Sequence, residues 1–276
     1  MSHDQQKETL PRAAFEKIRT LMYLRFGIFL SDSKKDLVVS RLAERLRKSG
    51  IHSYEDYIRF VMHDPAELSA MVDALTTNFT SLFREPEHFE FLEHAALPVL
   101  RMRKSIAIWS AGCATGEEPY TIACWLVGKL GSLRPGVHIL ATDISGRALA
   151  IAKRAVYPEA TFQGLSGNWR RRFLLRGGGQ STGLYRFKRE ITNLVNFAYL
   201  NLNEPLHRAG MFDVIFCRNV MIYFDHATRN KLLERLSAQL KPAGHFLPGH
   251  AESLPPEIYG MRRVHPAVYQ KREDAR

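Results

Sequence analysis

Cysteine is scarce in this chain of 276 residues, and the three that occur, Cys113, Cys124 and Cys217, are far apart in the sequence. Because there is no C-x-x-C pair, the sequence offers neither a disulfide framework nor the usual ligand spacing of zinc, and we expect no metal site. Long apolar runs are missing too, so no segment is predicted to insert in a membrane. Residues 1–11 are polar and contain no apolar signal core, so we expect cytoplasmic residence.

Acidic side chains are outnumbered, with 28 Asp and Glu against 39 Lys and Arg and a net charge of +11. The excess is local. Residues 1–82 hold 12 basic and 11 acidic side chains, whereas residues 151–190 hold nine basic and two acidic ones. A concentrated positive charge of this kind indicates an acidic partner near one surface.

The pattern of apolar residues changes near residue 105. Residues 11 to about 75 show helical spacing, as in Phe15, Ile18 and Met22. Short apolar runs then alternate with helical segments, which predicts an α/β fold with a parallel, doubly wound sheet behind an all-helical N-terminal domain. The expected strands are Ile106–Trp109, Val137–Ala141, Val195–Leu200, Phe212–Cys217 and His245–Leu247.

One segment does not follow the alternation. Residues 170–190 contain the run Gly177-Gly178-Gly179 and then Gly183, between two short strand-like pieces. Glycine permits the unusual backbone angles of a tight turn. We therefore expect a small antiparallel β insertion in the α/β domain.

The strand expected at Ile106–Trp109 leads into Ser110-Ala111-Gly112-Cys113-Ala114-Thr115-Gly116-Glu117-Glu118-Pro119, where a helix begins. A strand, a glycine loop and a helix form a nucleoside-cofactor crevice at the carboxyl end of a first strand. The spacing fits neither the dinucleotide fingerprint nor the P-loop. A cofactor with an adenosine and no phosphates remains, and S-adenosylmethionine (SAM) fits that description.

Two acids near this loop have more than one interpretation. Asp143 ends the second expected strand, where an acid accepts the ribose hydroxyls of a nucleoside, but it could also be a helix N-cap. Glu118 could hold the methionine ammonium of SAM, but Thr115-x-x-Glu118 also has capping-box spacing. Asn201 at the end of the third strand could bond an adenine edge or make a turn. Arg218 and Asn219 follow the buried fourth strand, and such a polar step is hard to explain as core.

Three segments together resemble the chemotaxis receptor methyltransferase family of the CheR type. They are the 76–85 run T-T-N-F-T-S-L-F-R-E, the 110–120 loop, and the 217–224 run C-R-N-V-M-I-Y-F. The similarity extends from about residue 12 to about residue 270. It implies a Rossmann-like SAM-dependent methyltransferase domain that methylates glutamate side chains on the cytoplasmic signalling helices of bacterial chemoreceptors. The organisation we expect is a helical domain over 1–82, a linker helix over 83–104 and a SAM-binding domain over 105–276, with a β-subdomain over 165–195.

The resemblance also implies roles for individual residues. Arg84 and Tyr223 match the family residues closest to the accepting carboxylate. The expected cofactor contacts are Asn78, Thr80, Arg84, Gly112, Glu118, Asp143, Asn201, Leu202, Arg218 and Asn219.

Two positive surfaces are candidates for receptor binding. One side of an expected helix carries Arg41, Arg45 and Lys48. This side is either a docking face for the receptor or a cationic edge exposed to solvent. The loop with Arg176, Gly177, Gly179 and Gly183 is similar to that of family members that bind a pentapeptide at the receptor's C-terminal end. A plain exposed hairpin is the alternative.

Two rival functions share some of these features. An RNA methyltransferase would interleave aromatic and basic residues, as Trp169, Phe173, Tyr185 and Phe187 do here. The helical N-terminal domain and the 76–85 run argue against it, and we expect no nucleic-acid partner and a monomer. A non-catalytic receptor adaptor could lose Asp143, Arg84 or Tyr223, but all three are present.

Overall fold

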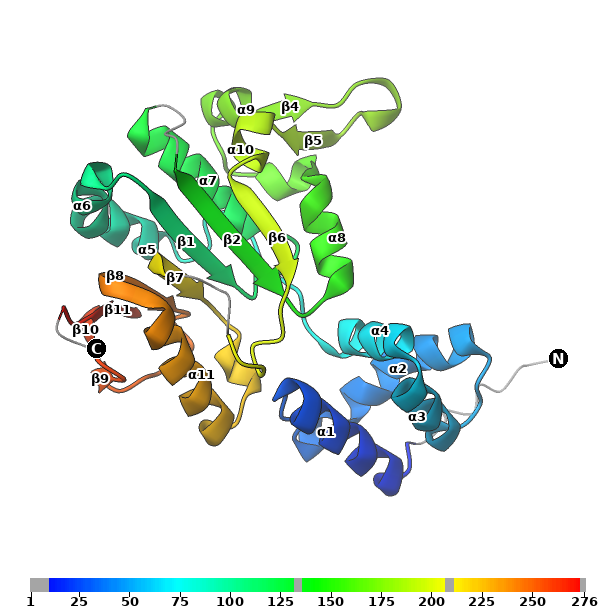
Figure 1. Cartoon of the computed structure of the whole chain (residues 1–276). Coiled ribbons are helices and arrows are strands. Elements are labelled where there is room, and N and C mark those ends of the chain that lie inside the picture. The colour runs from blue at the N-terminus through cyan, green and yellow to red at the C-terminus, as the bar shows by residue number, and fades with distance from the viewer. Residues whose placement is uncertain (1–9, 132–135, 207–210, 274–276) are drawn as a thin grey trace. The chain divides into compact units, whose positions relative to one another are not determined.

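The computed structural model describes residues 10–131, 136–206 and 211–273 (Figure 1). Contacts divide the chain into two compact units. One contains the chain up to Thr77 together with Tyr223–Asp225, and the other contains Asn78–Ile222 and the chain from His226 onward. No helix among the described residues is long and apolar enough to cross a membrane. The domain limits expected from the sequence remain a prediction, and contacts place the division five residues before residue 82.

The first unit is helical, as expected. Its α-helices are α1 (Arg12–Phe26), α2 (Lys35–Ser49), α3 (Tyr54–His63) and α4 (Pro65–Leu75), with a short 3-10 turn at Asp32–Lys34. Local signals set the helix ends: the Ser53 and Asp64 side chains accept backbone N–H groups at the starts of α3 and α4. Apolar side chains at helical spacing form the core, among them Ile18, Met22, Val38, Leu42, Tyr57 and Met71.

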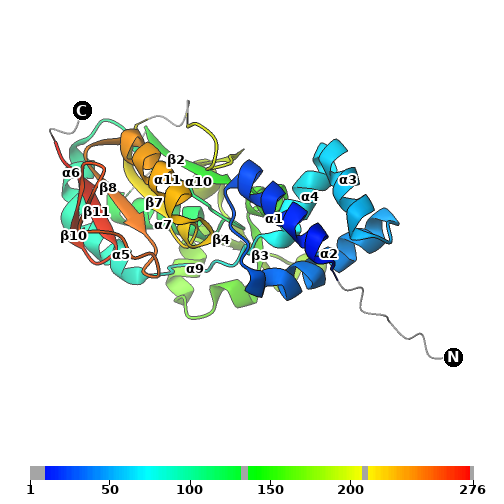
Figure 2. The ribbon, with the colours of Figure 1, turned by 90° about the horizontal axis from the view of Figure 1, so that it is seen from below.

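The second unit is built on an eight-stranded sheet of order β6-β2-β1-β7-β8-β11-β10-β9. Its parallel strands are β1 (Ile106–Ala111), β2 (Val137–Asp143), β6 (Val195–Tyr199), β7 (Phe212–Cys217) and β8 (Leu240–Pro248). Each corresponds to one of the five strands expected from the sequence, although β6 ends one residue before the expected Leu200, and the predicted fold class is confirmed. The antiparallel strands β9 (Glu257–Ile258), β10 (Met261–His265) and β11 (Val268–Lys271) were not predicted. Of these, β11 pairs with β8, and both are labelled with β10 in Figure 2.

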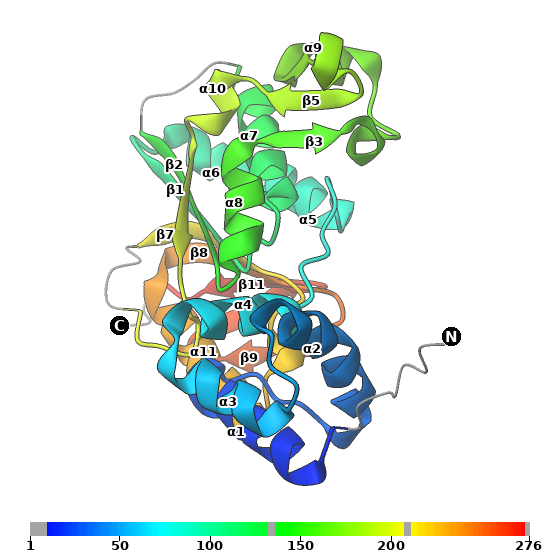
Figure 3. The same ribbon diagram turned by 90° about the vertical axis from the view of Figure 1, so that its right-hand side faces the viewer.

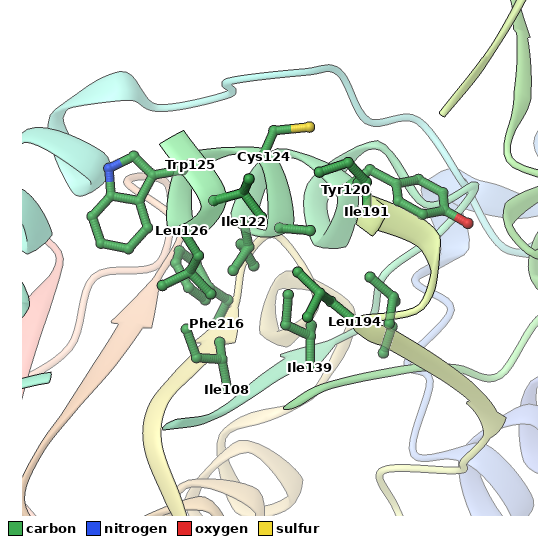
Figure 4. Packing of buried hydrophobic residues seen from close by; sticks show 14 of the residues in the cluster. Ile108, Tyr120, Ile122, Cys124, Trp125, Leu126, Ile139, Ile191, Leu194 and Phe216 are labelled. Carbon is green, nitrogen blue, oxygen red and sulfur yellow. The ribbon is translucent and has the colours of Figure 1, made fainter. Parts of the chain in front are cut away.

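Helices flank these strands. They are α5 (Pro86–Phe91), a π-helical turn (Leu92–Ala96), α6 (Leu97–Met102), α7 (Glu117–Leu130), α8 (Gly146–Arg154) and α11 (His226–Gln239). Figure 4 shows how α7 is held on the sheet: Ile122 and Leu126, one helical turn apart, point toward Ile108, Ile139 and Phe216 of the strands. All five side chains are buried. This apolar contact places the amino end of α7 at the carboxyl end of β1.

A second, three-stranded antiparallel sheet of order β3-β5-β4 forms the β insertion, set apart from the large sheet in Figure 3. Its strands are β3 (Val156–Pro158), β4 (Leu174–Arg176) and β5 (Leu184–Phe187). Short helices α9 (Gly167–Phe173) and α10 (Arg189–Thr192) and 3-10 turns at Glu159–Phe162 and Gly179–Ser181 complete it. The β3 strand begins before the segment that sequence spacing indicated.

A buried acid ties the strands together at the edge opposite their carboxyl ends. Asp213, 2% exposed, accepts the backbone N–H of Ala107 at 2.7 Å. Its carboxylate also pairs with Arg103 at 2.5 Å and Lys241 at 2.9 Å. Because Asp213 lies on β7 and its partners lie at the starts of β1 and β8, these contacts stabilise the start of the parallel sheet.

Candidate cofactor-binding and active site

The loop that follows β1 is held tightly on both sides. The backbone N–H groups of Gly112 and Cys113 both donate to the Thr142 carbonyl of β2, at 2.8 and 2.9 Å. Gly112 has a φ of +86°, and a Cβ there would lie 2.3 Å from the Val220 side chain. Only glycine fits this approach, so the loop after β1 lies directly against the loop after β7.

Asp143 connects the same loop to the end of β2. It is 7% exposed, and its two carboxylate oxygens accept the N–H groups of Ala114 and Ser145, both at 2.8 Å. The helix-capping alternative is wrong, because Ser145 is the N-cap of α8 and accepts from Ala148. Asp143 is therefore placed at the carboxyl end of β2, where the fold binds nucleosides.

Glu118 is not part of a capping box either. The N-cap of α7 is Gly116, with no side-chain cap, and the Thr115 hydroxyl donates to Glu117 instead. The Glu118 carboxylate accepts the Ser110 hydroxyl at 2.6 Å on one oxygen and the Arg218 Nε at 2.7 Å on the other. Burial raises the pKa of the neighbouring Glu117 carboxyl.

Arg218 is the centre of the polar cluster. It is 6% exposed, and its guanidinium joins Glu118 to the segment before α5: one nitrogen donates to the backbone carbonyl of Arg84 and lies 3.7 Å from Glu85. The guanidinium carbon lies over the Phe216 ring, 5.5 Å from its centroid. A planar fork with several donors suits this bridging role.

The segment before α5 has an unusual backbone. Phe83 and Glu85 have φ angles of +52° and +53°, a region that residues other than glycine seldom occupy. The N–H of Phe83 donates to the Thr121 hydroxyl at 3.2 Å, and Glu85 accepts the N–H of His250 at 3.1 Å. These contacts fix the backbone of Arg84. Among the residues that the structure describes, its guanidinium makes one long contact, of 3.4 Å, with the Phe79 carbonyl.

Other predicted residues lie at the same edge of the sheet. Asn201 and Leu202 follow β6, and the backbone bond from Leu200 to the Asp143 carbonyl, 3.1 Å long, keeps them beside Asp143. Asn201 is 2% exposed and also makes the turn considered from the sequence, accepting from Asn203 at 3.0 Å.

Asn219 has a φ of +58°, and its Oδ1 is buried without a hydrogen-bond partner among the described residues. A buried acceptor of this kind matches an ammonium donor such as that of a methionine moiety. The structure therefore fits a SAM-like cofactor at this point.

Not every predicted site residue joins this cluster. Asn78 and Thr80 are half-buried on the segment that precedes Arg84. Tyr223 is described with the helical unit, where its carbonyl accepts the N–H of Phe29 at 2.8 Å. The pairing of Tyr223 with Arg84 stays a prediction.

The predicted docking residues have partners within the helical unit. Arg41 donates to the carbonyls of Ala74 and Thr76 at the end of α4, at 2.9 and 3.0 Å. Arg45 pairs with the buried Glu67. Lys48 is exposed and pairs with Glu44 at 2.7 Å. Arg41 and Arg45 therefore stabilise the unit, whatever else they bind.

Sequence reasoning did not select Ser110, Glu85 or Glu252 as site residues. Ser110 and Glu85 are in the segments that carry the resemblance. What identifies them as part of the site is a contact seen in the structure, from Ser110 to Glu118 and from Glu85 to Arg218.

His88 lies beside this cluster. It is 3.5 Å from Glu85 and fully buried, and burial together with the nearby Arg218 charge lowers its pKa to about 3.

The fold and this cluster define a class. A parallel sheet whose first strand ends in a glycine loop, with a buried acid after the second strand, belongs to the α/β proteins that bind a nucleoside-containing cofactor.

The comparisons with known proteins define the family. Residues 13–76 match the all-alpha domain of CheR methyltransferase, and residues 78–267 match its SAM-binding domain. Chemotaxis protein methyltransferase 2 of Pseudomonas aeruginosa is 42% identical over 259 residues, which cover 94% of this chain and 92% of that protein. The chemotaxis protein methyltransferases of Salmonella typhimurium and Escherichia coli are 40% and 38% identical, over 90% of this chain and 86% and 87% of theirs. The chain belongs to the CheR methyltransferase family.

This membership confirms that the protein is a methyltransferase and that SAM is its cofactor. A solved structure, PKMT2 from Rickettsia typhi in complex with AdoHcy, is 18% identical with a TM-score of 0.34, over 52% of this chain and 21% of that one. At that score the likeness adds nothing to the assignment.

Replacing Asp143 by Asn tests the ribose contact. The carboxamide keeps the size of the side chain but removes the charge and turns one acceptor into a donor that faces the N–H of Ala114 or Ser145. We expect SAM affinity, measured by calorimetry, to fall at least about tenfold, because a charged hydrogen bond is worth about 1.5–3 kcal/mol. Exposed Glu90→Gln on α5 is the control, and unchanged affinity in Asp143→Asn would contradict the assignment.

Proposed function

We propose that this protein transfers the methyl group of SAM to glutamate side chains on the cytoplasmic signalling helices of bacterial chemoreceptors. The products are glutamyl methyl esters, which serve sensory adaptation, and the enzyme acts in the cytoplasm. Family membership and the names of its relatives support the receptor as substrate. The observation that carries the proposal is the buried Arg218–Glu118 pair, which holds the backbone of Arg84 beside the predicted cofactor residues.

The chemistry explains why such a site suffices. A glutamate side chain has a pKa of about 4.3, so at neutral pH it is already a nucleophilic carboxylate and needs no general base. SAM supplies a methyl group activated by a sulfonium. The task left to the protein is to orient the carboxylate and exclude water, and good positioning alone lowers a barrier by up to about 7–11 kcal/mol.

We assign that orientation to Arg84 and Tyr223. Within the described part of the chain, the Arg84 guanidinium has one long hydrogen bond, at 3.4 Å, to a carbonyl of its own segment, while its backbone is fixed by Arg218. A guanidinium on a rigid backbone is suited to pairing with an incoming carboxylate. Asp143 and the Asn201–Leu202 turn are proposed to hold the nucleoside, and Asn219 the methionine end.

Arg84→Ala tests the acceptor role. Receptor-containing membranes are incubated with methyl-labelled SAM, and base-labile, volatile label is counted. We expect the methylation rate to fall about 100-fold, the usual effect of misplacing a reacting group by about 1 Å. Arg154→Ala, which removes an exposed cation at the end of α8, is the control. A wild-type rate in Arg84→Ala would disprove the role, and label on RNA or base-stable label in the wild type would disprove the substrate.

Receptor docking is proposed at two places. The first place is Arg41, Arg45 and Lys48, which are predicted to bind the methylation helices. Lys48 is exposed, so its substitution tests docking without affecting folding.

The second place is the β insertion, which is proposed to bind a pentapeptide at the receptor's C-terminal end. Here β4 is an edge strand, and Arg176 and Leu175 on it are exposed. Edge strands accept an added peptide strand.

The turn beside β4 is well defined. The N–H of Gly177 donates to the Leu184 carbonyl at 2.8 Å, and a Cβ at Gly177 would lie 2.2 Å from the Ser181 carbonyl oxygen. Gly179 and Gly183 have φ angles of +57° and +82°. The glycines thus keep a closed turn next to Arg176, which supports capture of a terminal carboxylate there.

Calorimetric titration with a receptor C-terminal pentapeptide tests this tether. We expect binding by the wild type that is lost in Arg176→Glu and retained in Arg189→Glu, where the exposed cation lies outside the turn. The same peptide with an amidated C-terminus should bind more weakly, because its carboxylate is gone. No heat with the wild type at high peptide concentration would remove the tether from the account.

A further inference from the structure

Glu252 lies beyond the end of β8 and is buried, with 6% of its surface exposed. Its carboxylate accepts three backbone N–H groups: Met221 at 2.6 Å on one oxygen, and Gly249 at 2.7 Å and Asn219 at 3.1 Å on the other. These donors belong to two segments, the loop after β7 and the turn after β8. One anionic side chain therefore joins the carboxyl ends of two neighbouring strands.

The loop after β7 needs such an anchor. Asn219 adopts a φ of +58°, a left-handed conformation that asparagine tolerates better than most residues with a side chain and that surrounding contacts stabilise. The turn after β8 approaches so closely that a Cβ on Gly249 would lie 2.9 Å from the Asn219 nitrogen. The Glu252 carboxylate thus holds the backbone of Asn219, and the turn after β8 can come this close because residue 249 is glycine.

The same loop carries side chains of the polar cluster. Arg218 donates to Glu118 and to the Arg84 carbonyl, and Asn219 presents a buried Oδ1 without a partner among the described residues. The Val220 side chain occupies the space that a Cβ on residue 112 would need, so it contacts the loop after β1 directly. A shift of the 218–221 loop would therefore move groups in three parts of the site at once.

We propose that Glu252 is a positioning residue for SAM binding: its carboxylate holds the loop after β7 in the backbone conformation that places Arg218 and Asn219. It acts through those residues. The inference uses only the SAM-binding activity of the family and does not depend on the identity of the methyl acceptor.

Glu252→Gln tests the proposal with almost no change in size. Its carboxamide has one acceptor oxygen, and its NH2 group would face at least one of the N–H donors, so the loop must shift or leave buried donors unpaired. We expect the Kd for S-adenosylhomocysteine, measured by calorimetry, to rise at least about tenfold with a binding stoichiometry near that of the wild type. A variant that was merely less stable would bind with lower stoichiometry and an unchanged Kd.

Asp213→Asn is the matched control. Asp213 is also a buried acid that accepts a backbone N–H, but it lies at the start of β7, at the opposite end from the 218–221 loop. We expect this change to lower the melting temperature and to leave the Kd within about twofold, since positions apart from the site contribute independently.

A second variant leaves the carboxylate intact. Gly249→Ala puts a methyl group against the Asn219 nitrogen and should raise the Kd in the same way. It also decides the matter if Glu252→Gln does not fold. Wild-type Kd values in Gly249→Ala and in any folded Glu252→Gln would overturn the proposal. Because no receptor is present, this outcome is separate from any failure of the glutamate-methylation proposal.

Discussion

The buried guanidinium of Arg218 is the interaction on which the site depends. It pairs with Glu118 at the start of α7, touches Glu85 and bonds the Arg84 carbonyl. Three segments that are far apart in sequence meet around one charge. Without it, the buried Glu118 carboxylate would lose its cationic partner, which costs about 3–5 kcal/mol.

Such a cluster is a weak source of stability, because removing charges from water offsets most of the attraction between them. Its use is to select one arrangement of the segments. The strained backbone at Phe83, Glu85 and Asn219 fits this view, because left-handed φ angles at such residues persist where surrounding contacts enforce them. Stability comes from elsewhere, above all from the apolar packing of α7 on the parallel strands (Figure 4).

Much of this architecture follows from the sequence. Apolar runs of three to six residues located the parallel strands, because such strands are typically buried on both faces. The antiparallel strands β9 and β10 were not predicted from the sequence, because β10 is exposed and largely basic and polar, and β9 has only two residues. The glycine loop, Asp143 and Arg218 were selected as candidates from the sequence. Spacing could not distinguish a capping box from a carboxylate that binds a cation at Glu118, since both place a carboxylate at the first helical turn.

Side-chain partners are what spacing leaves out. A helical wheel groups Arg41, Arg45 and Lys48 on one side, but the structure pairs Arg45 with a buried acid and uses Arg41 at a helix end. Likewise, no sequence pattern selected Glu252 as a site residue, because its contacts are backbone donors from the loop after β7 and the turn after β8. Contacts of this kind depend on tertiary approach, which no local pattern records.

The most direct test of the account is the affinity of Arg218→Lys for S-adenosylhomocysteine. Lysine keeps the charge but is a point donor that cannot bridge Glu118 and the Arg84 carbonyl as a planar fork does. We predict that Arg218→Lys binds at least about tenfold more weakly at full stoichiometry, while Arg103→Lys, at the other end of the strands, binds like the wild type. Wild-type affinity in Arg218→Lys would contradict the claim that this guanidinium assembles the site.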